Sequence, residues 1–275
     1  MTQTVDTGRK VVLITGTTSG FGKLAAQRIA AAGHIVYGTH LPSETVSSPS
    51  PDLQLELDVR DQNLVRRCVD QVLSDRGRLD VLINNAGMGV FGAVEDIGID
   101  AAENQFSVNY FGTLRMIQAV LPHMRKAGAG RIVNFGSLAA RIGLPFQSHY
   151  SASKAAVEAL TEALRYEIHG TGVEATVISP GDFRTGFSAA RKVVTGHDPN
   201  FYQVKRTACL DAVNKSELGG QDPAVLGELI ARIVSSPKIK PRYTVGGFEQ
   251  LAVMRLKGLL PDGVLDPLVR REFGI

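Results

Sequence analysis

The chain has 275 residues, of which 44% are hydrophobic and 21% charged, and its formal net charge is +3. This composition indicates a globular protein, and without a run of lysine or arginine it argues against binding to nucleic acid. Cys68 and Cys209 form no disulfide framework and match no zinc spacing, so no metal site is predicted. No stretch approaches the ~20 apolar residues of a membrane span, and residues 1–10 lack a signal-peptide core, so we expect a cytoplasmic protein.

Short β-branched runs alternate with longer stretches of helical periodicity over the first two thirds of the chain. The runs predict buried parallel strands at residues 11–15, 35–38, 53–57, 81–84, 131–135 and 174–178. Apolar steps of three and four predict helices over residues 24–32, 62–75, 101–126, 151–169 and 223–234, with a kink or break at Pro122. The alternation predicts an α/β fold, a doubly wound (Rossmann) parallel sheet with helices on both faces.

The chain changes character after Ser179. Residues 181–220 mix glycine, aromatic and charged residues without a sustained period, which is typical of a lid or binding loop. Residues 251–260 recover helical character before Pro261, as in a packing or dimerisation helix, with contact to a membrane surface as the alternative. We expect a single domain over residues 1–275. Its cofactor-binding and catalytic core is 9–185, its substrate lid 186–220, and 221–275 holds the C-terminal helices, the last strand and the tail.

A glycine-rich turn follows the first predicted strand and opens the first helix. Gly16 permits a tight turn, Gly20 lets a pyrophosphate approach the backbone, and Gly22 allows close contact between helix and strand. The helix N-terminus adds free N–H groups and a positive dipole end. A purely structural turn is the alternative, because the spacing Gly-x3-Gly-x-Gly departs from the usual dinucleotide fingerprint. The candidate cofactor ligands here are Gly16, Thr18, Ser19, Gly20, Phe21 and Gly22.

The end of the second predicted strand decides between NAD and NADP. A carboxylate there binds the adenosine 2′-hydroxyl and repels a 2′-phosphate. Between Val36 and Glu44 the sequence has no carboxylate and no lysine or arginine, which leaves Ser19, Thr39 and His40 as candidate phosphate ligands. We therefore predict NADP as the cofactor, with NAD left open.

Two further segments are candidates for holding the nucleotide. Asp58, followed by Val59, comes after the third predicted strand, where its carboxylate can accept a hydrogen bond from an adenine amino group. A helix cap is the alternative, although Asp61 is better placed for it. The small residues Asn85, Ala86 and Gly87 after the fourth strand would let the backbone lie against a ribose, with an ordinary turn as the alternative.

The candidate reacting groups follow the fifth predicted strand. Ser137 ends that strand, and Tyr150 and Lys154 are four residues apart, so they share one helix face. A tyrosine pKa near ~10 is too high for proton transfer at neutral pH, and a neighbouring ammonium lowers it. Ser137 would hold a substrate oxygen while Tyr150 protonates it. A Tyr-x3-Lys pair alone is common on helices, so the indication of catalysis comes from its combination with Ser137 and the two turns.

These motifs, in this order over residues 9–185, resemble the short-chain dehydrogenase/reductase family. The resemblance implies that Tyr150 is the general acid/base, that Ser137 orients and polarises the carbonyl, and that Lys154 binds the nicotinamide ribose and lowers the pKa of Tyr150. It also implies a homodimer or homotetramer. Four further residues enter by resemblance: Asn109, holding a water of a proton relay through a local helix irregularity, and Pro180, Gly181 and Thr185 at the nicotinamide carboxamide.

Within the family, residues 36–39 and the basic, leucine-rich tail resemble the 17β-hydroxysteroid and retinol dehydrogenase branch. Leu41 stands where NADP-preferring members of that branch often place an arginine. Apolar residues flank the candidate catalytic positions, and they either line a substrate cavity or pack beneath the lid. They are Met88, Val90, Phe91, Leu138, Ile142, Leu144, Phe183 and Phe187. We predict NADPH-dependent reduction of a hydrophobic ketone or aldehyde, such as a steroid, retinoid or aryl ketone; the alternative is an NAD(P)-binding redox sensor with little turnover.

Overall fold

The structure is a computed structural model that describes residues 8–44, 53–185, 191–196, 200–257 and 260–275. Its centre is a seven-stranded sheet in the order β3-β2-β1-β4-β6-β7-β9, in which every neighbouring pair is parallel. The strands are β1 (Val11–Ile14), β2 (Ile35–His40), β3 (Leu53–Glu56), β4 (Val81–Asn84), β6 (Gly130–Phe135), β7 (Val173–Pro180) and β9 (Arg242–Val245). The predicted doubly wound fold is confirmed, with a strand at each of the six predicted places.

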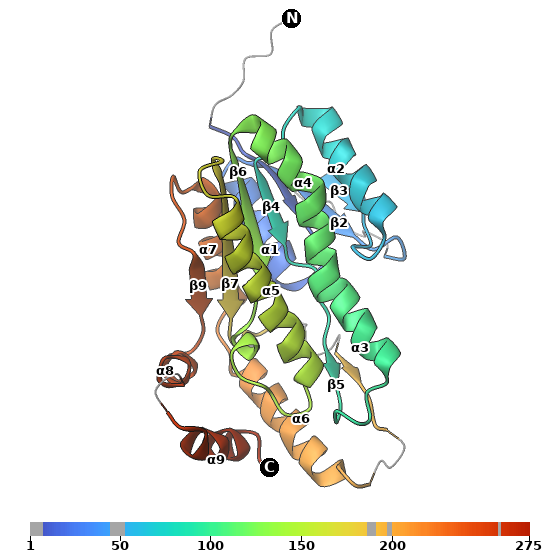
Figure 1. The fold of residues 1–275 in the computed structure, drawn as a ribbon, viewed down its shortest axis with the longest axis vertical. Coiled ribbons are helices and arrows are strands. Elements are labelled where there is room, and N and C mark those ends of the chain that lie inside the picture. Colours follow the sequence, from blue (N-terminus) through green and yellow to red (C-terminus); the bar gives the residue numbers. More distant parts are fainter. Residues whose placement is uncertain (1–7, 45–52, 186–190, 197–199, 258–259) are drawn as a thin grey trace, which may run out of the picture.

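Helices cover both faces of the sheet (Figure 1). On one face lie α2 (Gln62–Arg76), α4 (Thr113–Ala127) and α5 (Ser148–Glu167), and on the other α1 (Gly20–Ala31) and α7 (Pro223–Ser235). The apolar side chains of each layer form a separate buried cluster against its face of the sheet. This burial on both sides explains why the strands read as continuous β-branched runs rather than alternating ones.

The predicted helix over residues 101–126 corresponds to a longer helical run of three parts. It comprises α3 (Ile99–Phe106), a π-helical segment from Ser107 to Gly112, and α4. The irregularity therefore surrounds Asn109, as the family resemblance implies, whereas α4 continues through Pro122. Of the predicted kink or break at Pro122, the break is wrong, because the helix continues to Ala127 and is capped by Gly128 in the left-handed conformation that terminates helices.

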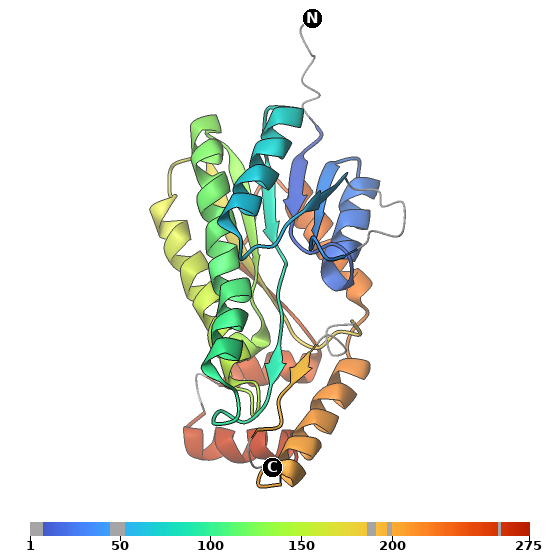
Figure 2. The same cartoon turned by 90° about the vertical axis from the view of Figure 1, so that its right-hand side faces the viewer.

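The segment predicted to be a loop contains a helix, α6 (Gln203–Leu218). Its buried positions are Arg206, Cys209 and Val213. An arginine therefore interrupts the apolar period, which is why the pattern was not recognisable as helical. Upstream, β5 (Val90–Phe91) pairs with β8 (Lys192–Val193), and Figure 2 shows this two-stranded ribbon beyond the carboxyl ends of the main sheet.

The C-terminal part forms two helices, α8 (Phe248–Leu256) and α9 (Asp262–Glu272). Pro261 does not simply end a helix; it is the N-cap of α9. Together with α6, these helices lie beyond the carboxyl ends of the strands (Figures 1 and 2). Within the described residues, no helix has the length and apolarity needed to cross a membrane, and no cluster of three His, Cys, Asp or Glu residues is placed to hold a metal.

Candidate active site

A cavity of about 1520 Å³ opens at the carboxyl ends of the strands, from the glycine turn before α1 to the C-terminal helices. Ligands of open parallel sheets bind in this position. Most of the predicted site residues line it. They are Gly16, Thr18, Ser19, Gly20, Phe21, His40, Asp58, Val59, Asn85, Ala86, Gly87, Ser137, Tyr150, Lys154, Pro180, Gly181 and Thr185. Gly22 and Asn109 are not part of the lining.

The glycine turn is fixed to the turn that follows β4. The Asn85 side-chain amide donates to the carbonyl oxygens of Thr15 (2.9 Å) and Gly16 (2.8 Å), while the Thr15 hydroxyl accepts from the Ala86 N–H (2.9 Å). Gly16 (φ +70°) and Gly20 (φ +54°) adopt the left-handed conformation that glycine tolerates best. Gly22 lies beneath the turn, where an added Cβ would be 2.0 Å from the Gly16 carbonyl oxygen.

This end of the cavity fits a dinucleotide. Ser19 is the N-cap residue of α1, but its side chain makes no capping hydrogen bond. The N–H groups of the first turn therefore face the cavity without a bond to the Ser19 hydroxyl. Uncapped N–H groups at the positive end of a helix dipole bind phosphate. The backbone of Gly16 and Gly20 carries no side chain that would block close approach.

The end of β2 contains a carboxylate that the sequence argument discounted. Glu44 lines the cavity, and its Oε2 accepts a hydrogen bond from the Leu41 N–H at 3.0 Å. Glu44 lies four residues beyond the strand, but the chain turns back there, so its side chain lies next to the strand end. His40 Nδ1 lies 3.0 Å from the Leu41 carbonyl oxygen and donates to it. A neutral His40 ring therefore presents only an acceptor, Nε2, to a ligand.

Asp58 is engaged with a neighbour. Both of its carboxylate oxygens accept from the Arg60 guanidinium, at 2.6 Å for Oδ2 and Nη2. The Arg60 hydrogen bond lowers the pKa of Asp58 below its usual value. An adenine amino group would have to share this carboxylate with Arg60. Asp61 caps α2 through the Asn63 and Leu64 N–H groups, as predicted.

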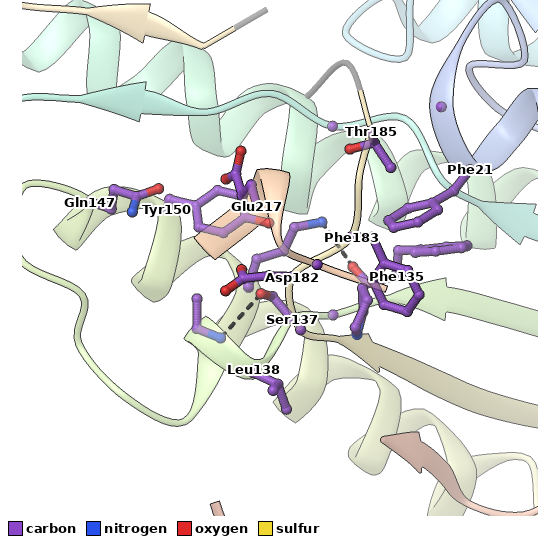
Figure 3. Close-up of a pocket in the computed structure, with 18 of the residues that line it drawn as sticks. Phe21, Phe135, Ser137, Leu138, Gln147, Tyr150, Asp182, Phe183, Thr185 and Glu217 are labelled. Carbon is purple, nitrogen blue, oxygen red and sulfur yellow. Dashed lines mark hydrogen bonds between the residues drawn. The ribbon is translucent and has the colours of Figure 1, made fainter. Parts of the chain in front are cut away.

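The candidate reacting groups meet at the middle of the cavity (Figure 3). Ser137 follows β6 and its Oγ accepts from the Ala139 N–H at 3.1 Å, which directs the hydroxyl towards Tyr150. Lys154 donates to the Phe135 carbonyl oxygen (2.9 Å), and its Nζ lies 5.9 Å from the centroid of the Tyr150 ring. Phe21 stacks on Phe135 at 6.0 Å and forms part of the wall next to them.

The pKa values of Tyr150 and Lys154 differ from the expectation that the lysine ammonium lowers the pKa of the tyrosine. Burial raises the pKa of Tyr150 to about 12, against the lowering effect of the hydrogen bond with Ser137, and Lys154 is not among the groups that shift it. Burial lowers the pKa of Lys154 to about 8, while Glu158 acts to raise it. In the protein by itself Tyr150 is thus a protonated acid at neutral pH, and the expected lowering of its pKa by Lys154 is absent.

Asn109 lies behind the cavity and joins two segments of its wall. Its side-chain oxygen accepts from the Met88 N–H (2.9 Å), and its amide donates to the Met88 carbonyl (3.0 Å) and to Ser153 Oγ (3.0 Å). Its backbone carbonyl accepts from the Thr113 hydroxyl at 2.9 Å within the π-helical segment. In this geometry Asn109 positions the loop after β4 against α5.

Glu158, one turn beyond Lys154 on α5, sets the charge of that lysine. It is buried, accepts from Ser179 Oγ at 2.5 Å and pairs with Arg242. Because Lys154 is charged below its pKa of about 8, we expect the rate of the catalysed reaction to fall as the pH rises through that value. Glu158→Gln removes the group that raises this pKa, so the fall should occur at lower pH.

The measurement is the pH profile of kcat for wild type and Glu158→Gln. Glu162→Gln is the matched control, since Glu162 is exposed one turn further along α5. A profile that moves equally in both variants, or in neither, contradicts the role given to Glu158.

Several residues of the site were missed by sequence reasoning. Asp182, Arg191 and Glu217 line the cavity near Tyr150, and they come from two loops and α6 with no local spacing that connects them. The C-terminal helices supply apolar wall residues, for which the amphipathic tail was the available signal. These are Val253, Met254, Leu265, Leu268 and Val269.

Of the apolar residues predicted to line the cavity, Met88, Leu138, Ile142, Leu144 and Phe183 do so. Val90 and Phe91 belong to β5 and are buried outside it, where Phe91 stacks on Phe146 at 5.7 Å. β5 turns away to pair with β8, and Phe91 packs against Cys209 and Val213 of α6, so for Phe91 the alternative of packing beneath the lid is confirmed. Phe187 lies outside the described residues.

Comparison with known proteins identifies the class. The sequence model of the short chain dehydrogenase family matches residues 10–193, so the chain belongs to the short-chain dehydrogenase/reductase family and is an NAD(P)-binding oxidoreductase. It is 40% identical over 269 residues to 3-ketodihydrosphingosine reductase of Bacteroides thetaiotaomicron. The aligned region covers 97% of this chain and 98% of that protein.

Two other relatives support the assignment. Human 17-beta-hydroxysteroid dehydrogenase type 1 is 33% identical over 286 residues, covering 97% of this chain and 87% of that protein. The crystal structure of a short-chain dehydrogenase from Streptomyces avermitilis, 32% identical, superimposes with a TM-score of 0.79 and covers 96% of both chains. The predicted family, with a steroid dehydrogenase among its relatives, is confirmed.

Proposed function

We propose that the protein reduces the ketone of a long apolar molecule with NADPH. The observation that carries the proposal is the shape of the cavity, which continues past Tyr150 to an apolar wall formed by α8 and α9. Binding there removes hydrocarbon from water, at roughly 25 cal/mol for each Å² buried. The relatives named for sphingoid-base and steroid chemistry support an apolar ketone in general, a class that includes the predicted steroids, retinoids and aryl ketones.

The catalytic roles follow from the geometry of the site. A nicotinamide cofactor bound here supplies the hydride for the carbonyl carbon. Ser137 and Tyr150 hold the carbonyl oxygen, and Tyr150, protonated by virtue of its burial, donates the proton that completes the alcohol. Lys154 binds the cofactor ribose, while Asn109 positions the wall and serves the proton relay.

The remaining cofactor ligands are assigned by their position in the cavity. The glycine turn and α1 bind the pyrophosphate, Asp58 and Val59 the adenine, residues 85–87 the ribose, and Pro180, Gly181 and Thr185 the carboxamide. Residues 9–185 thus form the core. In the proposed lid, 186–220, α6 contributes Val213 and Glu217 to the cavity. We also propose a homodimer or homotetramer built on the outer faces of α4 and α5, beside which Phe111 and Tyr166 are exposed.

NADPH is proposed because Ser19, Thr39 and His40 line the cavity where a 2′-phosphate would lie. Glu44 opposes this choice with a negative charge. Removing one charge next to a phosphate is worth about 1–2 kcal/mol at a solvated site. We therefore expect Glu44→Gln to raise the ratio of kcat/KM for NADPH to that for NADH about tenfold.

Steady-state kinetics with both cofactors measure this ratio. Glu56→Gln on β3 removes an exposed carboxylate outside the cavity and serves as the control. An unchanged ratio in Glu44→Gln would show that Glu44 does not face the ribose.

The function itself is tested by following oxidation of NADPH and NADH against a steroid ketone, an aryl ketone, a long-chain aliphatic ketone and a small polar ketose. Reduction of the apolar ketones, abolished in Tyr150→Phe, supports the proposal. Better reduction of the ketose overturns the substrate class. Cofactor binding without turnover of any ketone would favour the sensor instead.

A further inference from the structure

A charged cluster lies in the cavity beside the reacting groups, in contrast to the apolar wall beyond. It consists of Asp182 after β7, Arg191 before β8 and Glu217 near the end of α6. Figure 3 shows the carboxylates of Asp182 and Glu217 beside Ser137 and Tyr150. All three members of the cluster act electrostatically on Tyr150. A group bound by this cluster is therefore close to the substrate carbonyl.

Arg191 is buried but only partly satisfied. Its side chain is 3% exposed, and it pairs with Glu217 through Nη2. Among the described residues, neither its Nε nor its Nη1 has a hydrogen-bond partner, although both atoms are buried. Buried donors without an acceptor cost free energy, and Arg191 lines the substrate cavity. An acceptor oxygen bound next to Arg191 would supply the missing partner.

The carboxylates make the cluster negative overall. Asp182 accepts from Ser216 Oγ and from the Gln250 amide, both at 2.5 Å, through the same oxygen, Oδ2. The Glu217 side chain is 16% exposed and pairs with Arg191. Two carboxylates against one guanidinium leave the cluster a net charge of −1. The complementary ligand group is a cation.

We propose that this cluster binds the polar head of an amphiphilic amino ketone. The ammonium, attached to the carbon next to the carbonyl, lies between Glu217 and Asp182, and a neighbouring hydroxyl oxygen accepts from Arg191. The aliphatic chain extends along α8 and α9. This inference rests on the proposed function and narrows its substrate class; the head group itself forms and breaks no bond.

The test compares ketones that differ only in the head. The probes are 2-amino-1-hydroxydodecan-3-one, its N-acetyl derivative, which is uncharged, and 2-aminododecan-3-one, which lacks the hydroxyl. We expect KM to rise about tenfold or more on N-acetylation and about tenfold on loss of the hydroxyl, with smaller changes in kcat. The Kd values of the three alcohol products, of which 2-aminododecane-1,3-diol is the first, should follow the same order as the KM values when measured by calorimetry, which needs no turnover.

Two variants assign the effect to residues. Glu217→Gln should reduce the KM ratio between N-acetylated and free amino ketone to about one, and Asp182→Asn should reduce it several-fold. Asp182→Asn keeps an acceptor for Ser216 and Gln250, so it serves if Glu217→Gln fails to fold. Asp211→Asn, an exposed change on the same helix, should leave the ratio at its wild-type value.

The outcomes distinguish failure of the head-group site from failure of the proposed ketone reduction. Reduction of the N-acetyl ketone as readily as the amino ketone, or an unchanged KM ratio in both variants, overturns the head-group site and leaves the proposed ketone reduction standing. Failure to reduce any of the three probes or the apolar ketones with either cofactor overturns the proposed function, and the head-group site with it.

Discussion

Replacing Tyr150 by phenylalanine is expected to lower kcat for ketone reduction by about a hundredfold or more. The substitution removes only the hydroxyl, which is the proton donor beside Ser137, and leaves the ring in place. Burial raises the pKa of this hydroxyl to about 12, so it holds its proton throughout the neutral range. Without it, the developing oxyanion has Ser137 but no proton donor.

Cofactor affinity should change little in this variant, because the turns proposed to bind the cofactor and Lys154 are untouched. The measurement is kcat from steady-state kinetics together with the cofactor Kd from fluorescence titration. Tyr166→Phe is the matched control, since Tyr166 lies on the same helix, is 68% exposed and bonds only to Glu162 at 3.1 Å among the described residues. Turnover near that of wild type in Tyr150→Phe would refute the assignment of Tyr150.

The raised pKa of Tyr150 supports its proposed role as the acid in ketone reduction. A tyrosine that is protonated at neutral pH is ready to act as an acid, which reduction requires, whereas oxidation requires a base. Lys154, with a pKa near 8, is charged under the same conditions. Within the cluster proposed to bind the substrate head, Glu217 and Asp182 raise the pKa of Tyr150 further, whereas Arg191 lowers it.

The sequence was sufficient for those features that depend on local spacing. The fold follows from the alternation of buried runs and helical periods. The pairing of Ser137 with Tyr150 and Lys154 follows from the meeting of strand ends at one edge of a parallel sheet. The conformations of Gly16 and Gly20 follow from the few residues that a phosphate-binding turn permits.

The features that escaped prediction depend on where the chain returns in space. Glu44 was discounted because it lies four residues beyond β2, yet a turn brings its carboxylate back to Leu41. Asp182, Arg191 and Glu217 converge from three segments, and no spacing in the sequence relates them. Helix α6 escaped notice because Arg206 lies on its buried face, where its guanidinium reaches the Thr195 carbonyl at 3.2 Å.

Replacing Gly22 by alanine should lower both the stability and the cofactor affinity of the protein. Helix propensity alone would favour the alanine by about 1 kcal/mol. The added Cβ, however, would lie 2.0 Å from the Gly16 carbonyl oxygen and 2.6 Å from Asn85 Nδ2. The neighbouring atoms are backbone and a hydrogen-bonded amide, so the turn itself must move. We expect a net loss of about 2–3 kcal/mol in the free energy of unfolding, as for other overpacked sites.

The loss of cofactor affinity has the same physical origin. A shifted turn breaks the bonds from Asn85 to Thr15 and Gly16, which hold the phosphate-binding backbone in position. The cofactor Kd should therefore rise about tenfold or more, and the unfolding temperature should fall by about 5–10 °C. Gly263→Ala, in the first turn of α9 with open space around the added Cβ, is the control. Cofactor binding by Gly22→Ala as tight as that by this control would show that the close contact between helix and turn does not position the phosphate site. The uncapped N–H groups of α1 alone would then account for binding.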